Sequence, residues 1–162
     1  MEQLPNFWRS EIWHPLSVHF PIALLLFATI FKIIGLKFDS ELWRKGAFVL
    51  LLAGTAGAWI SVYTGNIADG EVSREICDPT VLKDHENLSN TVAWLFSIAT
   101  IFEILIITGI LKFKLLFIRI AVAILMLVGS GFLTYTGHLG ATIVYQQAAG
   151  VYHPSEDCSE FE

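Results

Sequence analysis

Residues 16–36 read LSVHFPIALLLFATIFKIIGL, an apolar run that is long enough to cross a bilayer as one helix. Three further runs have the same character, at Gly46 to Ile67, Leu88 to Leu111 and Leu115 to about Leu139. Hydrophobic residues make up 54% of the 162-residue chain and charged residues 15%. With a mean hydropathy of +0.61, this composition is typical of membrane proteins. The pattern predicts an all-α membrane protein with four transmembrane helices.

The first run does not have the features of a cleavable signal peptide. It follows a net acidic segment, is too long, and has no small-residue cleavage site. We therefore expect it to form the first helix of the bundle. Removing the four runs leaves no segment for a soluble domain, so we expect a single transmembrane domain over residues 1–162.

The segments that link the runs differ strongly in charge. Segments 37–45 and 112–119 carry six basic residues against two acidic ones. The N-terminus, the 69–86 loop and the C-terminal tail together carry three basic residues against twelve carboxylates. Because short basic loops stay in the cytoplasm, this asymmetry predicts that both termini and the central loop lie outside. In a bacterium we therefore expect the chain to be a multi-pass protein of the inner membrane with both termini in the periplasm.

The two halves of the chain are similar in sequence, which indicates a duplicated helical hairpin. Residues 27–34 and 98–105 are identical at five of eight positions, at an offset of 71. The tripeptide Tyr-Thr-Gly recurs at 63–65 and 135–137, at an offset of 72. Each half would run out-in-out, so the two copies would be related by a pseudo-twofold axis along the membrane normal.

This duplication sets the expected limits of the parts of the domain. We expect repeat 1 over about 12–70, repeat 2 over about 83–145, and a periplasmic tail at 146–162. The offset places Lys32 on Glu103, two charges inside the apolar zone. These two residues are expected to form a structural ion pair across the axis or to contribute to a proton path, with Arg119 as a competing partner for Glu103.

Four of the five histidines are expected at the periplasmic end of the bundle. His14 and His19 open the first run, His85 precedes the third, and His138 closes the fourth. Imidazoles placed where side chains leave water commonly ligate a metal or a haem iron. The same positions would also suit histidines that only form hydrogen bonds in a wet interface.

The repeat divides these histidines into two pairs. His14 and His85 are equivalent, whereas His19 and His138 align with asparagines. His14 and His19 lie about 140° apart around a helix and cannot both face one iron. Equal depth on facing helices favours His19 and His138 as the axial ligands of a b-type haem. His14 and His85 would form a second haem site or supporting contacts.

Two further sets of residues bear on such a site. An axial histidine needs a hydrogen-bond partner on its other ring nitrogen, and the candidates are Ser17, Asn66, Asn90 and Thr136. Small residues recur in the second and fourth runs, at Ala53, Gly57, Ser61 and Gly65 and at Ala121, Gly129 and Gly137. Close helix packing and a flat slot for a porphyrin are both consistent with these small residues.

Both cysteines are expected on the oxidising side of the membrane. Cys77 lies in the central loop and Cys158 in the tail. They are candidates for a disulfide that ties the tail to the loop, or they are two unrelated thiols. Covalent c-type haem attachment is excluded for this chain, because it has no Cys-x-x-Cys-His motif.

Residues 14–24 (HPLSVHFPIAL) and 137–145 (GHLGATIVY) carry a resemblance to a known family. They resemble the HPxxVHFPIA opening and the GHxGGxLVY close of an uncharacterised bacterial family of four-helix inner-membrane proteins. Ala141 replaces the second glycine of the Gly-Gly pair in the close. Some relatives join this domain to c-type cytochrome modules, and the resemblance therefore implies a role in respiratory electron transfer.

Together these features predict an electron-transfer protein or subunit rather than a stand-alone enzyme. The expected cofactor is haem b, in one or two copies. The expected partners are the lipid bilayer and the quinone pool, periplasmic c-type cytochromes or a respiratory complex, and no nucleic acid. Two other hypotheses stay open: a copper, zinc or iron site made by the four histidines, and a non-catalytic assembly subunit of a membrane complex.

Overall fold

A computed structural model describes residues 8–38, 40–111 and 113–151 of the chain. A short 3-10 helix, η1 (Ser10–Ile12), precedes four long helices, which are α1 (Trp13–Lys37), α2 (Glu41–Glu75), α3 (Pro79–Ile107) and α4 (Leu115–Gln147). All four are long and apolar enough to cross a membrane, and no strand occurs in the described ranges. The prediction of an all-α protein with four such helices is confirmed.

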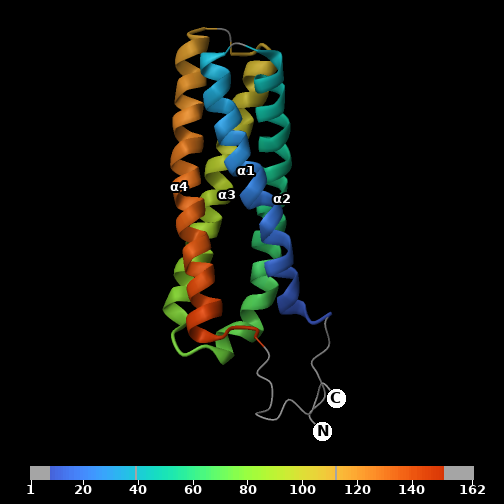
Figure 1. The fold of residues 1–162 in the computed structure, drawn as a ribbon, viewed down its shortest axis with the longest axis vertical. Coiled ribbons are helices and arrows are strands. Elements are labelled where there is room, and N and C mark those ends of the chain that lie inside the picture. Colours follow the sequence, from blue (N-terminus) through green and yellow to red (C-terminus); the bar gives the residue numbers. More distant parts are fainter. Residues whose placement is uncertain (1–7, 39, 112, 152–162) are drawn as a thin grey trace.

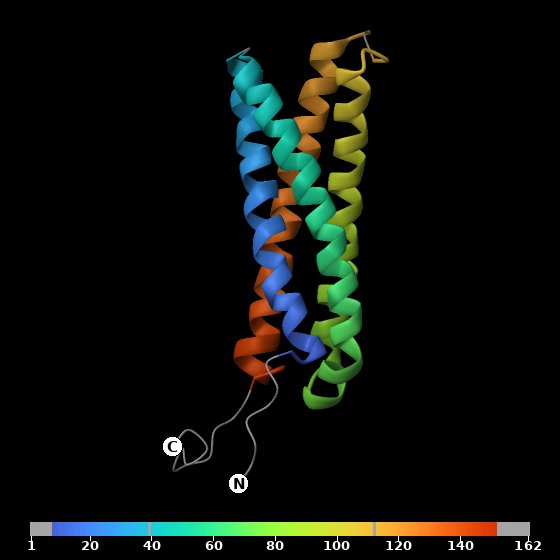
Figure 2. The same cartoon turned by 90° about the vertical axis from the view of Figure 1, so that its right-hand side faces the viewer.

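The helices form two adjacent hairpins. Each helix packs against the next along the chain, and α1 also packs against α4, so that α1 and α3 lie diagonally across the bundle. The start of α1, the α2–α3 turn and the end of α4 share one end of the molecule (Figure 1). We call this the histidine end. The opposite end, which holds the α1–α2 and α3–α4 loops, is called the basic end. The hairpins diverge towards the basic end (Figure 2).

Two helices extend beyond the apolar runs at the histidine end. The helix α2 continues past Ile67 to Glu75, and α4 continues past Leu139 to Gln147. A helix of 35 residues is about 52 Å long, which exceeds the roughly 30 Å of a hydrocarbon core. The extra turns of α2 are polar and include Asp69 and Glu71. The helices α2 and α4 are therefore longer than their apolar parts, and their extra turns lie at the histidine end.

The α2–α3 turn is fixed by a cap and by a contact with α4. Asp78 is the N-cap of α3, and its carboxylate accepts hydrogen bonds from the hydroxyl and the backbone N–H of Thr80. These two bonds lower the pKa of the Asp78 carboxyl below its ordinary value. The Asp78 backbone N–H also donates to Gln147 Oε1 over 2.8 Å, which joins the turn to the end of α4.

The core is built from equivalent contacts in the two hairpins. Leu25 lies against Gly54, where an added Cβ would be 2.7 Å from the leucine side chain. Phe96 lies against Gly129 in the same way, with 3.1 Å to the ring. Leu25 and Phe96 are both completely buried. These glycines let a large side chain of one helix press against the backbone of the next.

The same recurrence appears in polar contacts between the hairpins. Thr29 Oγ1 contacts Ser130 Oγ at 3.0 Å, and Thr100 Oγ1 contacts Thr55 Oγ1 at 2.9 Å. Threonines 29 and 100 differ by 71, whereas positions 55 and 130 differ by 75. Such paired contacts are what a twofold relation between the hairpins generates. The contacts thus match α1 to α3 at an offset of 71 and α2 to α4 at an offset of 75.

Lys32 and Glu103 form an ion pair inside the bundle, in the half nearer the basic end. The Lys32 ammonium donates to Glu103 Oε1, and the two side chains are 9% and 10% exposed. The predicted contact between Lys32 and Glu103 is confirmed. Because the two residues are equivalent at the offset of 71, their contact lies where a twofold axis would pass.

Candidate functional site

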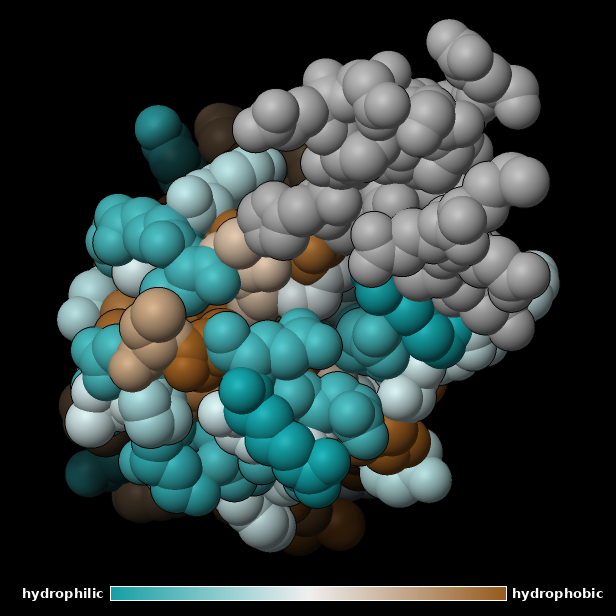
Figure 3. Space-filling model, turned by 90° about the horizontal axis from the view of Figure 1, so that it is seen from below, coloured by the Kyte–Doolittle hydropathy of each residue, from teal (hydrophilic) through white to brown (hydrophobic). Residues whose placement is uncertain are grey.

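A cavity of about 470 Å³ opens between the four helices at the histidine end. All four helices contribute to its wall, which includes His14 and His19 of α1, Ser61 of α2, His85 of α3 and Gly140 of α4. Hydrophilic side chains gather on this end of the molecule (Figure 3). The size is within the range of small-molecule and cofactor sites in proteins.

His14 and His85 meet inside this cavity. Their ring centroids are 5.9 Å apart, and their planes are nearly perpendicular, at 87°. One ring comes from α1 and the other from α3, the helices on opposite corners of the bundle. Like Lys32 and Glu103, the two histidines differ by 71 positions, so this contact also joins residues that are equivalent at that offset.

Each of the two imidazoles is held by a backbone carbonyl of its own hairpin. His14 Nδ1 lies 2.9 Å from the Ser61 carbonyl oxygen, and His85 Nδ1 lies 3.0 Å from that of Thr136. A carbonyl oxygen can only accept, so each Nδ1 must carry the proton and donate it. In a neutral imidazole this leaves the Nε2 lone pair available as a base or a ligand.

Glycines make room for both rings. An added Cβ at Gly65 would be 3.1 Å from His14 Cε1 and Nδ1, and one at Gly140 would be 3.2 Å from His85 Cε1. Each glycine follows its accepting carbonyl by four residues, so the ring lies over the helix turn that this carbonyl closes. A larger residue at either position would push the ring away from the carbonyl.

Among the described residues, one polar side-chain atom of the cavity wall is buried and has no hydrogen-bond partner. This atom is the hydroxyl oxygen of Ser61. Buried hydroxyls are normally hydrogen-bonded, so this oxygen could bond to a group that enters the cavity. Three carboxylates, those of Glu11, Asp69 and Glu86, also contribute to the wall.

The other two histidines lie differently from this pair. His19 lines the cavity, yet its residue is exposed. His138 is exposed on α4, stacks on Tyr135 with a centroid distance of 6.3 Å, and is not part of the cavity wall. The described residues show no ring contact between His19 and His138. The structure therefore brings together the symmetric pair, not the pair that depth along the helices favours.

The contacts also alter the matching of residues between the second and fourth helices. Gly54 and Gly129 have equivalent contacts, as do Gly65 and Gly140, and both pairs differ by 75 positions. The recurring Tyr-Thr-Gly differs by 72, about one helical turn less. By contacts, His138 is therefore matched by Tyr63 rather than by Asn66.

The candidate partners for an axial histidine have mixed positions. Thr136 supplies its carbonyl to His85, whereas the hydroxyl of Ser17 donates to the His14 carbonyl. Asn66 and Asn90 line the cavity, and the Asn90 amide donates to the Glu86 carbonyl. The sequence did not indicate that the Ser61 carbonyl and Gly140 would contact the two histidines. The line of small residues in the second run did include positions 61 and 65.

The cysteines can be placed only in part. Cys77 is exposed in the turn between α2 and α3. Cys158 lies outside the described residues, as does most of the predicted tail at 146–162. The candidate disulfide stays a prediction.

A family model described as predicted membrane protein (DUF2231) matches residues 12–153. The chain belongs to this family. The match includes all four helices and both histidine pairs of this DUF2231 member. No curated protein and no solved structure matches it. The family match confirms the resemblance to a family of membrane proteins.

Proposed function

We propose that this protein binds one b-type haem through His14 and His85, and that it transfers electrons near the periplasmic face of a bacterial inner membrane. The observation that carries the proposal is the meeting of the two imidazoles inside a cavity at the histidine end. The cytoplasmic placement of the basic end, by the positive-inside rule, is part of the same proposal.

The spacing of the two rings fits axial ligation. A metal–imidazole bond is about 2 Å long and the ring centre lies about 1 Å further back, so two imidazoles that share one iron have centroids about 6 Å apart. The separation of 5.9 Å between His14 and His85 is close to this value. Perpendicular planes are compatible with ligation, since two imidazoles that bind one metal ion do not have to be coplanar.

The hydrogen bonds of the two rings also fit. Histidines that ligate a metal almost always donate the other ring N–H to a carboxylate or a backbone carbonyl, which fixes the tautomer and the ring orientation. His14 and His85 both donate through Nδ1 to a carbonyl, and Nε2 is left as the potential ligand. The same support on both sides of the cavity is what two equivalent axial ligands require.

The donor set favours haem over a bare metal ion. Zinc and similar ions take three or more protein ligands, whereas a haem iron already has four porphyrin nitrogens and needs only two. Over the described ranges no group of three or more His, Cys, Asp or Glu side chains is arranged to hold an ion. A pair of imidazoles beside a cavity of about 470 Å³ is better suited to a flat macrocycle.

A haem bound here would supply one-electron redox chemistry. The chain's own residues would hold the iron, fix both imidazole tautomers, and restrict water within the cavity. The carboxylates of Glu11, Asp69 and Glu86 lie in the cavity wall. Together with the acidic outer segments they would steer a basic electron-transfer partner towards this end, such as a periplasmic c-type cytochrome. Quinone or a respiratory complex is proposed as the membrane partner.

The absorption spectrum of detergent-purified protein from haem-replete cells tests the proposal. We expect a Soret band of low-spin character and about one haem per chain by pyridine extraction. Stoichiometric copper, zinc or iron without porphyrin would instead support the four-histidine metal hypothesis. A colourless, metal-free protein that co-purifies with a respiratory complex would support the assembly-subunit hypothesis. Either result would refute haem binding.

The glycines under the rings provide a second test. Gly140→Ala and Gly65→Ala should each lower haem affinity by about tenfold, because the new methyl displaces a ring from its carbonyl. Haem titration of the apoprotein measures the effect. Gly131→Ala on α4 is the matched control, since an added Cβ there meets no atom within 4 Å. Equal affinities in all three variants would show that the rings do not hold the haem.

A further inference from the structure

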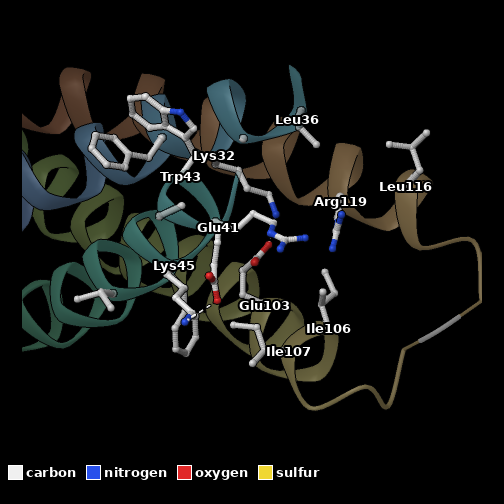
Figure 4. Close-up of a pocket in the computed structure, with 16 residues that line it drawn as sticks. Lys32, Leu36, Glu41, Trp43, Lys45, Glu103, Ile106, Ile107, Leu116 and Arg119 are labelled. Carbon is white, nitrogen blue, oxygen red and sulfur yellow. Dashed lines mark hydrogen bonds and ion pairs between the residues drawn. The ribbon is translucent and has the colours of Figure 1, made fainter. Parts of the chain in front are cut away.

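A second cavity, of about 770 Å³, lies at the basic end, where the hairpins diverge. All four helices contribute to it. Figure 4 shows Lys32, Glu103 and Arg119 directed towards its interior, with Leu36, Ile106 and Leu116 around them. It is separate from the cavity of the two histidines and plays no part in the proposed haem site.

Positive charge exceeds negative charge around this second cavity. Four cationic side chains and two carboxylates line it. Both carboxylates are already paired, Glu103 with Lys32 inside the bundle and Glu41 with Lys45 on the surface. Arg119 is half-buried and makes no ion pair with another residue in the described ranges. The cavity therefore suits an anion.

The cavity is apolar where it opens to the outside of the bundle. Val49, Ile107 and Leu116 line it and are 61%, 59% and 65% exposed. In a membrane such side chains face acyl chains, and Trp43 beside them is of the residue type that prefers the headgroup level. Cationic side chains inside the cavity suit an anionic headgroup, and the apolar rim suits acyl chains. Together they suit an anionic amphiphile.

We propose that this cavity binds an anionic phospholipid of the cytoplasmic leaflet. The headgroup phosphate would lie beside Arg119, and the acyl chains would pass over the exposed rim. Basic pockets between transmembrane helices on the cytoplasmic side are known to receive anionic lipid headgroups. The apolar rim distinguishes this ligand from free phosphate, which would gain nothing from Ile107 or Leu116.

Native mass spectrometry of the full chain in neutral detergent tests the proposal. Wild-type protein should retain phosphatidylglycerol and not phosphatidylcholine when both are supplied equally. Arg119→Gln should weaken phosphatidylglycerol binding about fivefold, the effect of one basic residue at a lipid surface. Arg119→Lys should keep most of it. Lys37→Gln is the matched control, because it removes a charge at the same end from a residue outside the cavity wall.

Three outcomes would overturn the proposal. One is equal retention of the two lipids, and another is equal weakening by Arg119→Gln and Lys37→Gln. The third is displacement of phosphatidylglycerol by millimolar inorganic phosphate, which would make the cavity a site for free anions. If Arg119→Gln does not fold, Arg119→Met is the second variant, since it keeps an unbranched apolar side chain and removes the charge; unchanged binding in that variant would equally count against the proposal.

Discussion

Replacing His14 or His85 with alanine is expected to abolish the low-spin haem spectrum. Each ring would be one of only two protein ligands to the iron, and its loss leaves a five-coordinate haem or none. We expect the ratio of bound haem to protein to fall by more than about tenfold, since loss of a mere supporting hydrogen bond costs about 10- to 100-fold in metal affinity. The spectrum and the pyridine extract of the purified variants measure this.

The chain supplies its own controls for this experiment. His19→Ala and His138→Ala remove the same side chain from exposed positions at the same end of the bundle. Both variants should keep the wild-type spectrum. If instead they lose it while His14→Ala and His85→Ala keep it, the axial ligands are His19 and His138. A helical circular dichroism spectrum equal to that of the wild type establishes that each variant is folded.

The second large effect is expected at the buried ion pair. Lys32→Ala or Glu103→Ala should each destabilise the protein by about 3–5 kcal/mol, because the remaining partner is left as an unpaired charge inside the bundle. Thermal unfolding in detergent, followed by circular dichroism, measures this loss. The double variant Lys32→Met/Glu103→Leu should regain most of the stability, since both charges are removed together.

An exposed pair elsewhere in the chain is the matched control. Lys45 and Glu41 are 2.6 Å apart and 75% and 69% exposed. Lys45→Ala should change stability far less than either buried variant, because an ion pair between exposed side chains is weakened by water and salt. If Lys32→Ala were as mild as Lys45→Ala, the pair would not contribute to folding, and a role for Glu103 in proton movement would gain support.

The sequence predicted the helices better than their ends. Four apolar runs are enough to predict four long helices, because a helix makes all its backbone hydrogen bonds within one segment and needs no water inside the bilayer. The polar residues after Ile67 break the hydropathy pattern, yet α2 continues to Glu75. Helices do not have to stop where the apolar zone stops, so hydropathy gives the length of the apolar part only.

The contact between Lys32 and Glu103 could be predicted because the two residues are equivalent at the offset of 71 and are opposite charges inside the apolar zone. For His14 and His85 the sequence indicated equivalence alone, because the offset does not show which equivalent residues face one another. The choice of His19 and His138 depended on depth along the helices. Depth does not say in which direction a side chain points, and that direction is set by packing between helices, which a single sequence does not contain.

Gly140 illustrates the same difficulty. The Tyr-Thr-Gly match pairs Gly65 with Gly137, where an added Cβ would meet no atom within 4 Å. Contacts instead match Gly65 to Gly140, three residues further on, where the ring of His85 lies. Three residues are almost one helical turn, so both matches look alike along the sequence. Only the packed structure separates them.

Low-temperature electron paramagnetic resonance of the oxidised wild-type protein shows whether His14 and His85 bind one haem iron. Two imidazoles on one iron give a low-spin ferric haem, and the perpendicular ring planes of His14 and His85 predict a strongly anisotropic signal. We expect this signal in the wild type and its absence in His14→Ala. A high-spin ferric signal, or no haem signal at all in haem-replete protein, would contradict this expectation.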